Sequence, residues 1–212
     1  MLETEAWRLH VALSPVRMSP YLLRTGGDPV SALRLHCWNT EISSAFYGPL
    51  QFLEVAMRVG MNRQLALLFG QDDWWNHPNA RLTSVANRKI ADAVSQVTRL
   101  RLPVDAEQIT DQLSFGFWVA LLGRGDNYDQ RLWRPALHKA FPHFRGPRRE
   151  LHARLDHHRI LRNKIAHHGP IHNRHLTADY ESIVTCLTLI DPDLAAMVRR
   201  HGDIAEVLSR RP

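Results

Sequence analysis

The sequence contains little cysteine and no long apolar run. Its 212 residues include two cysteines, Cys37 and Cys186, which are far apart and have apolar neighbours. They form neither a disulfide framework nor a cysteine-based zinc site, so we expect both to be buried. The longest apolar runs, such as residues 115–122, are well short of the roughly 20 residues that a bilayer span needs. Residues 1–10 lack the apolar segment of a signal peptide, so we expect a cytoplasmic protein that contacts no membrane.

Alternation of polar and apolar residues, the pattern of a half-buried strand, is also missing. Apolar residues instead recur three or four apart, which predicts an all-α fold. The length suits one domain, and we find no linker, repeat or low-complexity segment, so we expect a single helical domain over residues 1–212. The expected helices cover residues 31–47, 50–68, 83–101, 105–122, 127–140, 147–168, 177–190 and 192–200.

Helix boundaries follow from capping and breaking residues. Gly48 and Pro49 predict a break between the first two helices, which we expect to form a core hairpin. Thr83 and Asp105 are expected N-caps of the third and fourth helices. The pair Gly169-Pro170 ends the helix that begins near residue 147.

Aromatic residues gather in a few short stretches. Residues 113–118 place three rings around Gly116, and we expect these rings to lie in the core, with the glycine allowing close helix approach. The same interpretation applies to Trp74, Trp75 and Trp133.

Positive charge is concentrated in one segment. Residues 131–164 contain ten Lys or Arg and two acidic residues, which makes this segment +8, while the chain as a whole is +6 and the remainder therefore −2. Seven of the 13 histidines lie in or just beyond this segment. A local basic patch indicates a polyanionic partner, although many such patches are only solvated surfaces.

A polar stripe runs along the predicted helix over residues 147–168. At 100° per residue, its members fall within one narrow sector, while leucines and Ile165 occupy a neighbouring one. The stripe consists of His152, Asp156, Arg159, Asn163 and His167. Because the helix ends at Gly169-Pro170, we expect His167 and His168 to lie at a helix terminus.

A histidine beside guanidinium groups suits phosphodiester chemistry. RNA carries its own nucleophile, the 2′-OH, so an enzyme needs to remove that proton, stabilise charge on phosphorus and protonate the leaving oxygen. We therefore assign His167 as general acid or base, Arg162 as stabiliser of the phosphate charge and Asn163 as the orienting group. Arg162 and His167 are five residues apart and lie about 140° apart on a straight helix. They converge only through a bent arginine, a distorted last turn or a second subunit.

The string at residues 161–168, Leu-Arg-Asn-Lys-Ile-Ala-His-His, resembles the Arg-Asn-x-x-x-His signature of HEPN domains. More narrowly, the chain resembles the Abi-like (abortive infection) proteins of bacteria over roughly residues 14–195. Further landmarks occur in the order expected of that family. They lie at residues 19–23, 35–39, 44–47, 54–58, 113–118, 132–135, 140–142 and 167–171.

The resemblance implies a HEPN-type helical bundle with additional helices and a homodimer whose facing signature helices build a shared site. It also implies a metal-independent endoribonuclease, without cofactor, that acts as a toxin in phage defence. It assigns Arg162, Asn163 and His167 to the active site. Helpers in RNA binding would be Arg154, Arg159, Lys164 and His168. A protein or small-RNA antitoxin would be a further partner.

The sequence also allows three alternative interpretations. His167, His168, His172 and His175 could form a metal site, but no HExxH motif or cysteine partner accompanies them. A HEPN module that binds RNA or a nucleotide without cleaving it would keep the same helix as a binding surface. DNA-binding regulation would need a recognition-helix pair, which the sequence does not show.

Overall fold

The computed structural model describes residues 2–212, which form ten α-helices and no β-strand. The all-α prediction is confirmed. The helices are α1 (Glu3–Ala12), α2 (Pro15–Arg24), α3 (Pro29–Phe69), α4 (Ser84–Arg99), α5 (Ala106–Gln112), α6 (Phe115–Leu121), α7 (Arg148–Ala166), α8 (Leu176–Ile190), α9 (Pro192–His201) and α10 (Ile204–Ser209).

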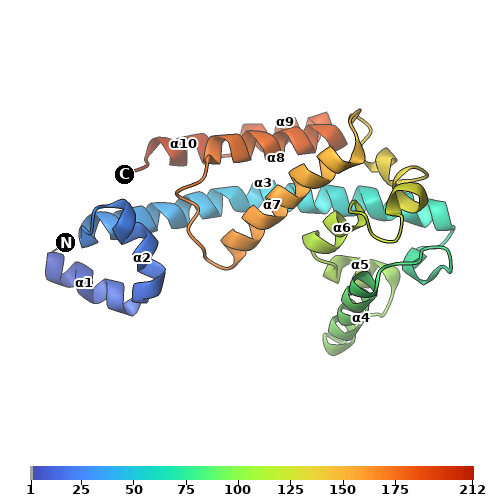
Figure 1. Ribbon diagram of the computed structural model, residues 1–212, viewed down its shortest axis with the longest axis horizontal. Helices are drawn as coiled ribbons and strands as arrows, with labels where there is room; N and C mark the ends of the chain where they lie inside the picture. The colour runs from blue at the N-terminus through green and yellow to red at the C-terminus, as the bar shows by residue number, and fades with distance from the viewer. Residues whose placement is uncertain (1) are drawn as a thin grey trace.

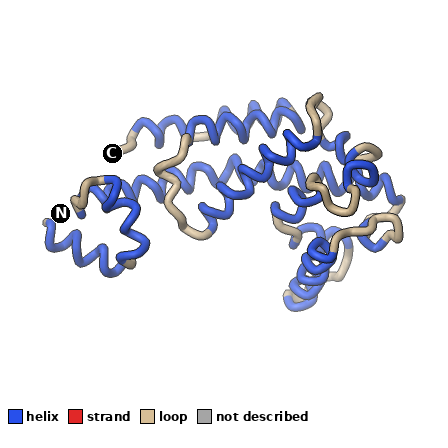
Figure 2. Tube along the Cα trace, viewed as in Figure 1, coloured by secondary structure: helices blue, strands red, loops and turns tan. Residues whose placement is uncertain are grey.

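Helix α3 is the central element and runs along the long axis of the molecule (Figure 1). Its 41 residues span about 60 Å at 1.5 Å per residue. Helices α8, α9 and α10 follow one side of α3, and α7 crosses it obliquely. The helical pair α1–α2 packs near the beginning of α3, while α4, α5 and α6 gather toward its other end (Figure 2).

The predicted break at Gly48-Pro49 is wrong, because α3 continues through Pro49 without interruption. A proline inside a helix costs about 3 kcal/mol. Phe46, Leu50 and Leu53 lie on both sides of Pro49 and are buried in one core. Full burial of each such side chain contributes about 1.5–3 kcal/mol, so packing offsets the cost of the proline. The expected core hairpin is thus a single helix.

The predicted single helix over residues 105–122 is also wrong, because it is divided into α5 and α6. Leu113 and Ser114 have extended backbone between them. The N–H of Phe115 donates to Oε1 of Glu54 on α3 at 2.8 Å. This tertiary contact fixes the start of α6 and could not be read from local sequence.

The expected helix over residues 127–140 is replaced by a π-helical turn, Asp129–Trp133, and a 3-10 turn, Leu137–Ala140. Pro135 lies between the two turns and has no N–H to continue a helix.

Other boundaries are confirmed. The Thr83 hydroxyl accepts a hydrogen bond from the Ala86 N–H (3.3 Å), and the Asp105 carboxylate accepts one from the Gln108 N–H (2.9 Å). Helices α7, α8 and α9 each begin and end within two residues of their predicted limits. Helices α1, α2 and α10 lie outside the predicted set.

The aromatic residues form the core, as expected. Trp74, Trp75, Phe115, Phe117 and Trp118 are buried, and Trp133 is partly buried beside Phe141 and Phe144.

The two cysteines differ. Cys186 is buried, and burial raises the pKa of its thiol to about 12. Cys37 is exposed, so the expectation for it is wrong. Leu35, Trp38 and Ile42 define the buried side of this part of α3, and position 37 falls on the opposite side at 100° per residue. Within residues 2–212, no helix has both the length and the apolar character needed to cross a bilayer.

Candidate active site on helix α7

Helix α7 is fastened at its first turn by Arg148. The guanidinium donates to the carbonyls of Leu122 and Gly123 at the end of α6, and its Nε lies 3.0 Å from Asp129 Oδ1. This arginine satisfies carbonyl groups that a helix end leaves without partners. The side of α7 that faces the core consists of Leu151, Leu155, His158 and Leu161. The apolar side is therefore where the sequence predicted it, and the polar stripe lies beside it.

The last turn of α7 ends in a two-bond cap. The His168 N–H donates to the Ile165 carbonyl (2.9 Å), and the Gly169 N–H donates to the Lys164 carbonyl (2.8 Å). This is the Schellman pattern, in which the residue after the C-cap takes a left-handed conformation and is most often glycine. Here that residue is His168, with φ of 56°. A Cβ at the next residue, Gly169, would lie 2.9 Å from Lys164 Cγ, so the close approach of Lys164 favours glycine at this position. The prediction that His167 and His168 lie at a helix terminus is confirmed.

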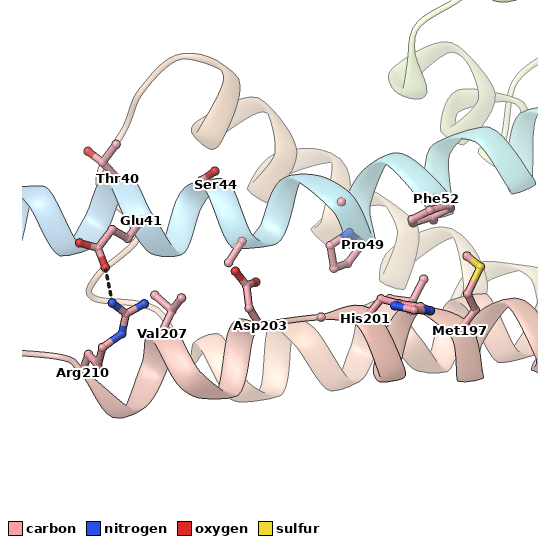
Figure 3. Close-up of a pocket in the computed structure, with 14 residues that line it drawn as sticks. Thr40, Glu41, Ser44, Pro49, Phe52, Met197, His201, Asp203, Val207 and Arg210 are labelled. Atoms are coloured by element: carbon pink, nitrogen blue, oxygen red, sulfur yellow. Dashed lines mark ion pairs between the residues drawn. The ribbon is translucent and has the colours of Figure 1, made fainter.

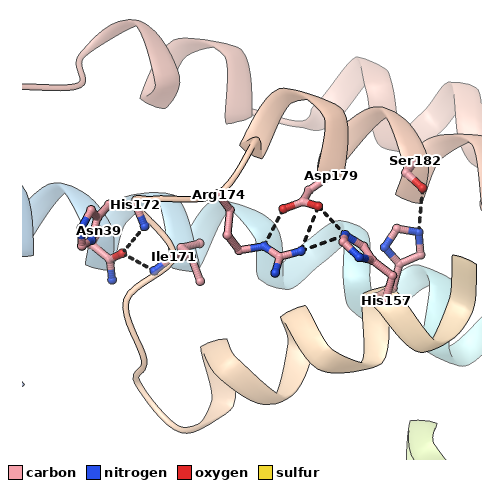
Figure 4. A network of polar contacts seen from close by, with 8 residues as sticks. Asn39, His157, Ile171, His172, Arg174, Asp179 and Ser182 are labelled. Atoms are coloured by element: carbon pink, nitrogen blue, oxygen red, sulfur yellow. Dashed lines mark hydrogen bonds and ion pairs between the residues drawn. The ribbon is translucent and has the colours of Figure 1, made fainter. Parts of the chain in front are cut away.

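The chain after this cap is tied to α3 by one buried amide. Asn39 Oδ1 accepts hydrogen bonds from the Ile171 N–H (2.7 Å) and the His172 N–H (3.0 Å), as Figure 4 shows. The His172 ring packs against Tyr21, and burial lowers its pKa, with Arg211 adding to the effect. Asn39 therefore fixes where the C-terminal end of α7 lies relative to α3.

A second polar network joins α7 to α8 (Figure 4). Asp179 accepts from Arg174 Nε at 2.7 Å, and its Oδ1 lies 2.6 Å from His157 Nε2. Burial raises the pKa of Asp179, but the bonds from Arg174 and His157 outweigh it and leave the pKa below its usual value. The neighbouring His158 is fully buried and pairs with the Ser182 hydroxyl at 3.1 Å. These groups hold the two helices together on the side away from the stripe.

Arg162 faces α3. Its Nε lies 3.4 Å from Glu54 Oε2, and its side chain is 40% exposed. Both residues line a pocket of about 500 Å³ between α3 and α7, together with Tyr47, Arg58 and Ile165. Arg162 thus lies beside an acidic side chain and within reach of solvent.

Asn163 opens into a different pocket, of about 370 Å³, between α4, α6 and α7. His152, Asp156, Arg159 and Arg162 line the same pocket. Four of the five stripe residues are therefore partly covered by α6. Gly116 allows this approach, as predicted, because a Cβ there would lie 3.3 Å from Arg159 Cδ.

His167 is exposed and lines a third pocket, of about 490 Å³, formed with α2 and α3. Arg17, His36 and His168 line it too. The structure therefore does not bring the proposed triplet together within one chain, because Arg162 and Asn163 share one pocket and His167 lines another.

The remaining predicted RNA-binding residues also divide. Arg154 pairs with Glu150 (2.6 Å) and lines none of the three pockets. Arg159 Nε pairs with Asp156 Oδ1 at 2.6 Å. Lys164 is half-buried over Gly169, and His168 is exposed beside His167.

The basic segment is partly used by the fold itself. Half of its ten cations bond to nearby carboxylates or carbonyl oxygens outside the three pockets. These are Arg131, Arg134, Arg145, Arg148 and Arg154. Of the other five, Arg159, Arg162 and Lys164 lie on the C-terminal half of α7, where Arg159 and Arg162 each have a carboxylate nearby.

Two cationic pocket residues were not predicted from the sequence. Lys89 on α4 and Arg17 on α2 add positive charge to the second and third pockets. Each is far from residue 160 along the chain, and no local pattern links either one to α7.

Another pocket, of about 780 Å³, lies elsewhere, between α3 and the helices α9 and α10 (Figure 3). Phe52, Pro49 and Met197 give it an apolar lining, and Glu41 pairs with Arg210 at 3.7 Å across one end. None of the predicted site residues lines it. Among residues 2–212, no three His, Cys, Asp or Glu side chains converge on a position that could hold a metal ion.

Comparison of the chain with protein-family models, curated proteins and solved structures finds no match. The resemblance to HEPN and Abi-like proteins therefore rests on the residues themselves.

Proposed function

We propose that the protein is a metal-independent endoribonuclease whose site includes His167, Arg162 and Asn163. The observation that supports this most directly is the exposed His167 at the capped end of α7, one turn beyond Arg162 and Asn163. An exposed imidazole at a helix end can serve as a general acid or base, and a guanidinium can bind a phosphate.

The chemistry follows from RNA. One general base takes the proton of the 2′-OH, whose oxygen then bonds to phosphorus. The bond from phosphorus to the 5′-oxygen breaks, and a general acid gives that oxygen a proton. The products are a 2′,3′-cyclic phosphate and a 5′-OH. Arg162 would stabilise the added charge on the phosphate oxygens during this step.

A second copy of the chain would complete the site. Since Arg162 and His167 line different pockets, one chain alone does not direct both groups at one phosphate. The pocket beside Arg162 is bordered by exposed apolar residues. Tyr47 is 67% exposed and Val55 is 38% exposed. In the proposed dimer this surface is buried against the second subunit, whose His167 supplies the missing group.

Purified protein incubated with total RNA in EDTA tests the activity. We expect cleavage by the wild type, loss of cleavage in His167→Ala and no change in His175→Ala, an exposed histidine nearby. Fragments ending in 2′,3′-cyclic phosphate support the proposed step, whereas 5′-phosphate ends contradict it. Absence of cleavage by the wild type would overturn the proposal.

Mixing two inactive variants tests the shared site. Heterodimers of Arg162→Ala and His167→Ala contain one intact composite site, so we expect partial recovery of cleavage. Verified heterodimers without recovery would show that each chain carries its own complete site. A role as a toxin in phage defence, acting in the cytoplasm under a protein or small-RNA antitoxin, is part of the same proposal.

The second candidate is a module that binds RNA or a nucleotide without cleaving it. The ion pair between Arg162 and Glu54 favours it, because a paired arginine is less available to a transition state. This function predicts RNA retention without turnover, lost on charge reversal at Arg159 or Arg162.

A further inference from the structure

We propose that the pocket between α4, α6 and α7 binds a phosphate of the RNA strand next to the phosphate that is cleaved, with Lys89 as its main contact outside α7. The inference rests on the proposed function for the identity of the strand. It adds a binding site that adjoins the proposed active site through Arg162 and Asn163, and a residue from a helix that shares no sequence pattern with α7.

Cationic side chains outnumber carboxylates in this pocket. Lys89, Arg159 and Arg162 line it, and Asp156 is its one carboxylate. Arg159 is paired with Asp156 at 2.6 Å and Arg162 lies 3.4 Å from Glu54, which leaves Lys89 as the cation without a carboxylate partner. Among residues 2–212, no carboxylate lies within 4.0 Å of the Lys89 ammonium. A half-buried ammonium without an acidic partner is available to an anion.

Gly116 keeps the centre of the pocket open. A Cβ at this position would lie 3.3 Å from Arg159 Cδ and 3.7 Å from Lys89 Nζ. The two cationic side chains therefore approach the same space from α7 and α4, and a side chain at position 116 would occupy it.

Other polar groups around this space can donate hydrogen bonds. The Asn163 amide, the Ser114 hydroxyl and the His152 ring line the same pocket. A phosphate oxygen accepts hydrogen bonds from all three group types, and two cations satisfy its charge. This combination fits a phosphodiester better than an uncharged ligand.

The pocket extends along α7 away from the proposed active site. Arg162 and Asn163 line one end of it and belong to that site, whereas Arg159 lies three residues before Arg162, about 4.5 Å along the helix axis. A strand whose cleaved phosphate lies at Arg162 and that runs along α7 would bring the next phosphate to Lys89. The pocket would therefore contribute to the binding of oligonucleotides. It would not contribute to the binding of a dinucleoside monophosphate, whose one phosphate is the one that is cleaved.

The binding test uses a short 2′-O-methyl oligonucleotide, which lacks the free 2′-OH needed for cleavage. We expect Lys89→Gln to weaken its binding about fivefold at 0.1 M salt and to lower the salt slope by about 0.7, the value for one lost contact to a single strand. Lys89→Arg should retain binding. Arg88→Gln removes the same charge from the next residue of α4, which is exposed and outside the pocket, and should bind nearly as the wild type does. Equal losses in Lys89→Gln and Arg88→Gln would overturn the proposal.

The cleavage test separates this pocket from the active site. We expect Lys89→Gln to lower kcat/KM for an oligoribonucleotide and to leave cleavage of a dinucleoside monophosphate unchanged. Equal losses on both substrates would overturn the flanking-phosphate assignment. If the wild type cleaves neither substrate while Lys89-dependent binding persists, the proposed function fails and this binding site stands. Cleavage without any Lys89-dependent binding would overturn the binding site alone.

Discussion

His158 shows how a single buried side chain can make stability depend on pH. It lies on α7 with no exposed surface, and burial lowers its pKa from 6.5 to about 4. The unfolded chain takes up a proton below pH 6.5, whereas the folded chain resists it until about pH 4. With respect to His158, the free energy of unfolding is therefore highest above pH 6.5, and it decreases as the pH falls toward 4. We expect His158 to account for about 3 kcal/mol of the stability lost between these values.

His158→Leu removes this titration while keeping an apolar side chain in the core. Its free energy of unfolding, measured by urea denaturation between pH 7 and pH 4, should decrease less than that of the wild type as the pH is lowered. The control is His175→Leu, because His175 is exposed. Identical pH profiles for His158→Leu and the wild type would contradict the assignment. A smaller residual slope is expected from His172, whose pKa burial also lowers.

Asn39 makes a residue-scale contribution to the position of the site. Asn39→Ala leaves the buried N–H groups of Ile171 and His172 without their acceptor, and each such loss costs about 1–3 kcal/mol. We expect a loss of about 2–4 kcal/mol in the free energy of unfolding and faster amide hydrogen exchange at both residues. Thr40→Ala, at an exposed neighbouring position, should change neither quantity by much. Unchanged exchange at Ile171 and His172 in Asn39→Ala would show that the amide does not hold this loop.

At the scale of elements, Pro49 is a test of the continuous helix. Pro49→Ala restores a backbone donor inside α3, where proline costs about 3 kcal/mol, although it also loosens the unfolded chain and removes buried contacts. We expect a net gain of about 1–2 kcal/mol in thermal or urea unfolding. Pro29→Ala is the matched control, because Pro29 lies in the first turn of the same helix, where proline is tolerated, and should bring no gain. Equal effects of the two substitutions would argue for a break at residues 48–49.

The helices whose ends carry their own signals were predictable. Thr83 and Asp105 are N-caps, and Gly169-Pro170 follows the end of α7, so local chemistry was enough. The errors arose where a distant contact decides the outcome. The hydrogen bond from the Phe115 N–H to Glu54 separates α5 from α6, and core packing on both sides of Pro49 keeps α3 whole. Neither contact can be inferred from the hydrophobic periodicity of the segment in which it occurs.

At the scale of the whole molecule, the sequence could locate the candidate helix and its polar stripe but not its surroundings. Whether two stripe residues share a pocket depends on which helices cover α7. Helix α6 covers the stretch from His152 to Asn163, whereas α2 and α3 surround His167. Lys89 and Arg17 join these pockets through tertiary packing alone. The separation of Arg162 from His167 is thus a property of the assembled fold.

If a second subunit brings its His167 to Arg162, the exposed ring of Tyr47 beside Arg162 must lie in the interface. Tyr47→Glu would bury a carboxylate there, and loss of a central aromatic contact costs about 2 kcal/mol or more, which raises the dimer Kd roughly thirtyfold. Analytical ultracentrifugation should then show a dimer for the wild type and mainly monomer for Tyr47→Glu. Val85→Glu changes a similarly exposed residue on α4, at 62%, and should leave the dimer intact. Because the composite site needs two chains, RNA cleavage should fall together with dimerisation in Tyr47→Glu. A monomeric variant that cleaves RNA as fast as the wild type would show that the site is complete in one chain.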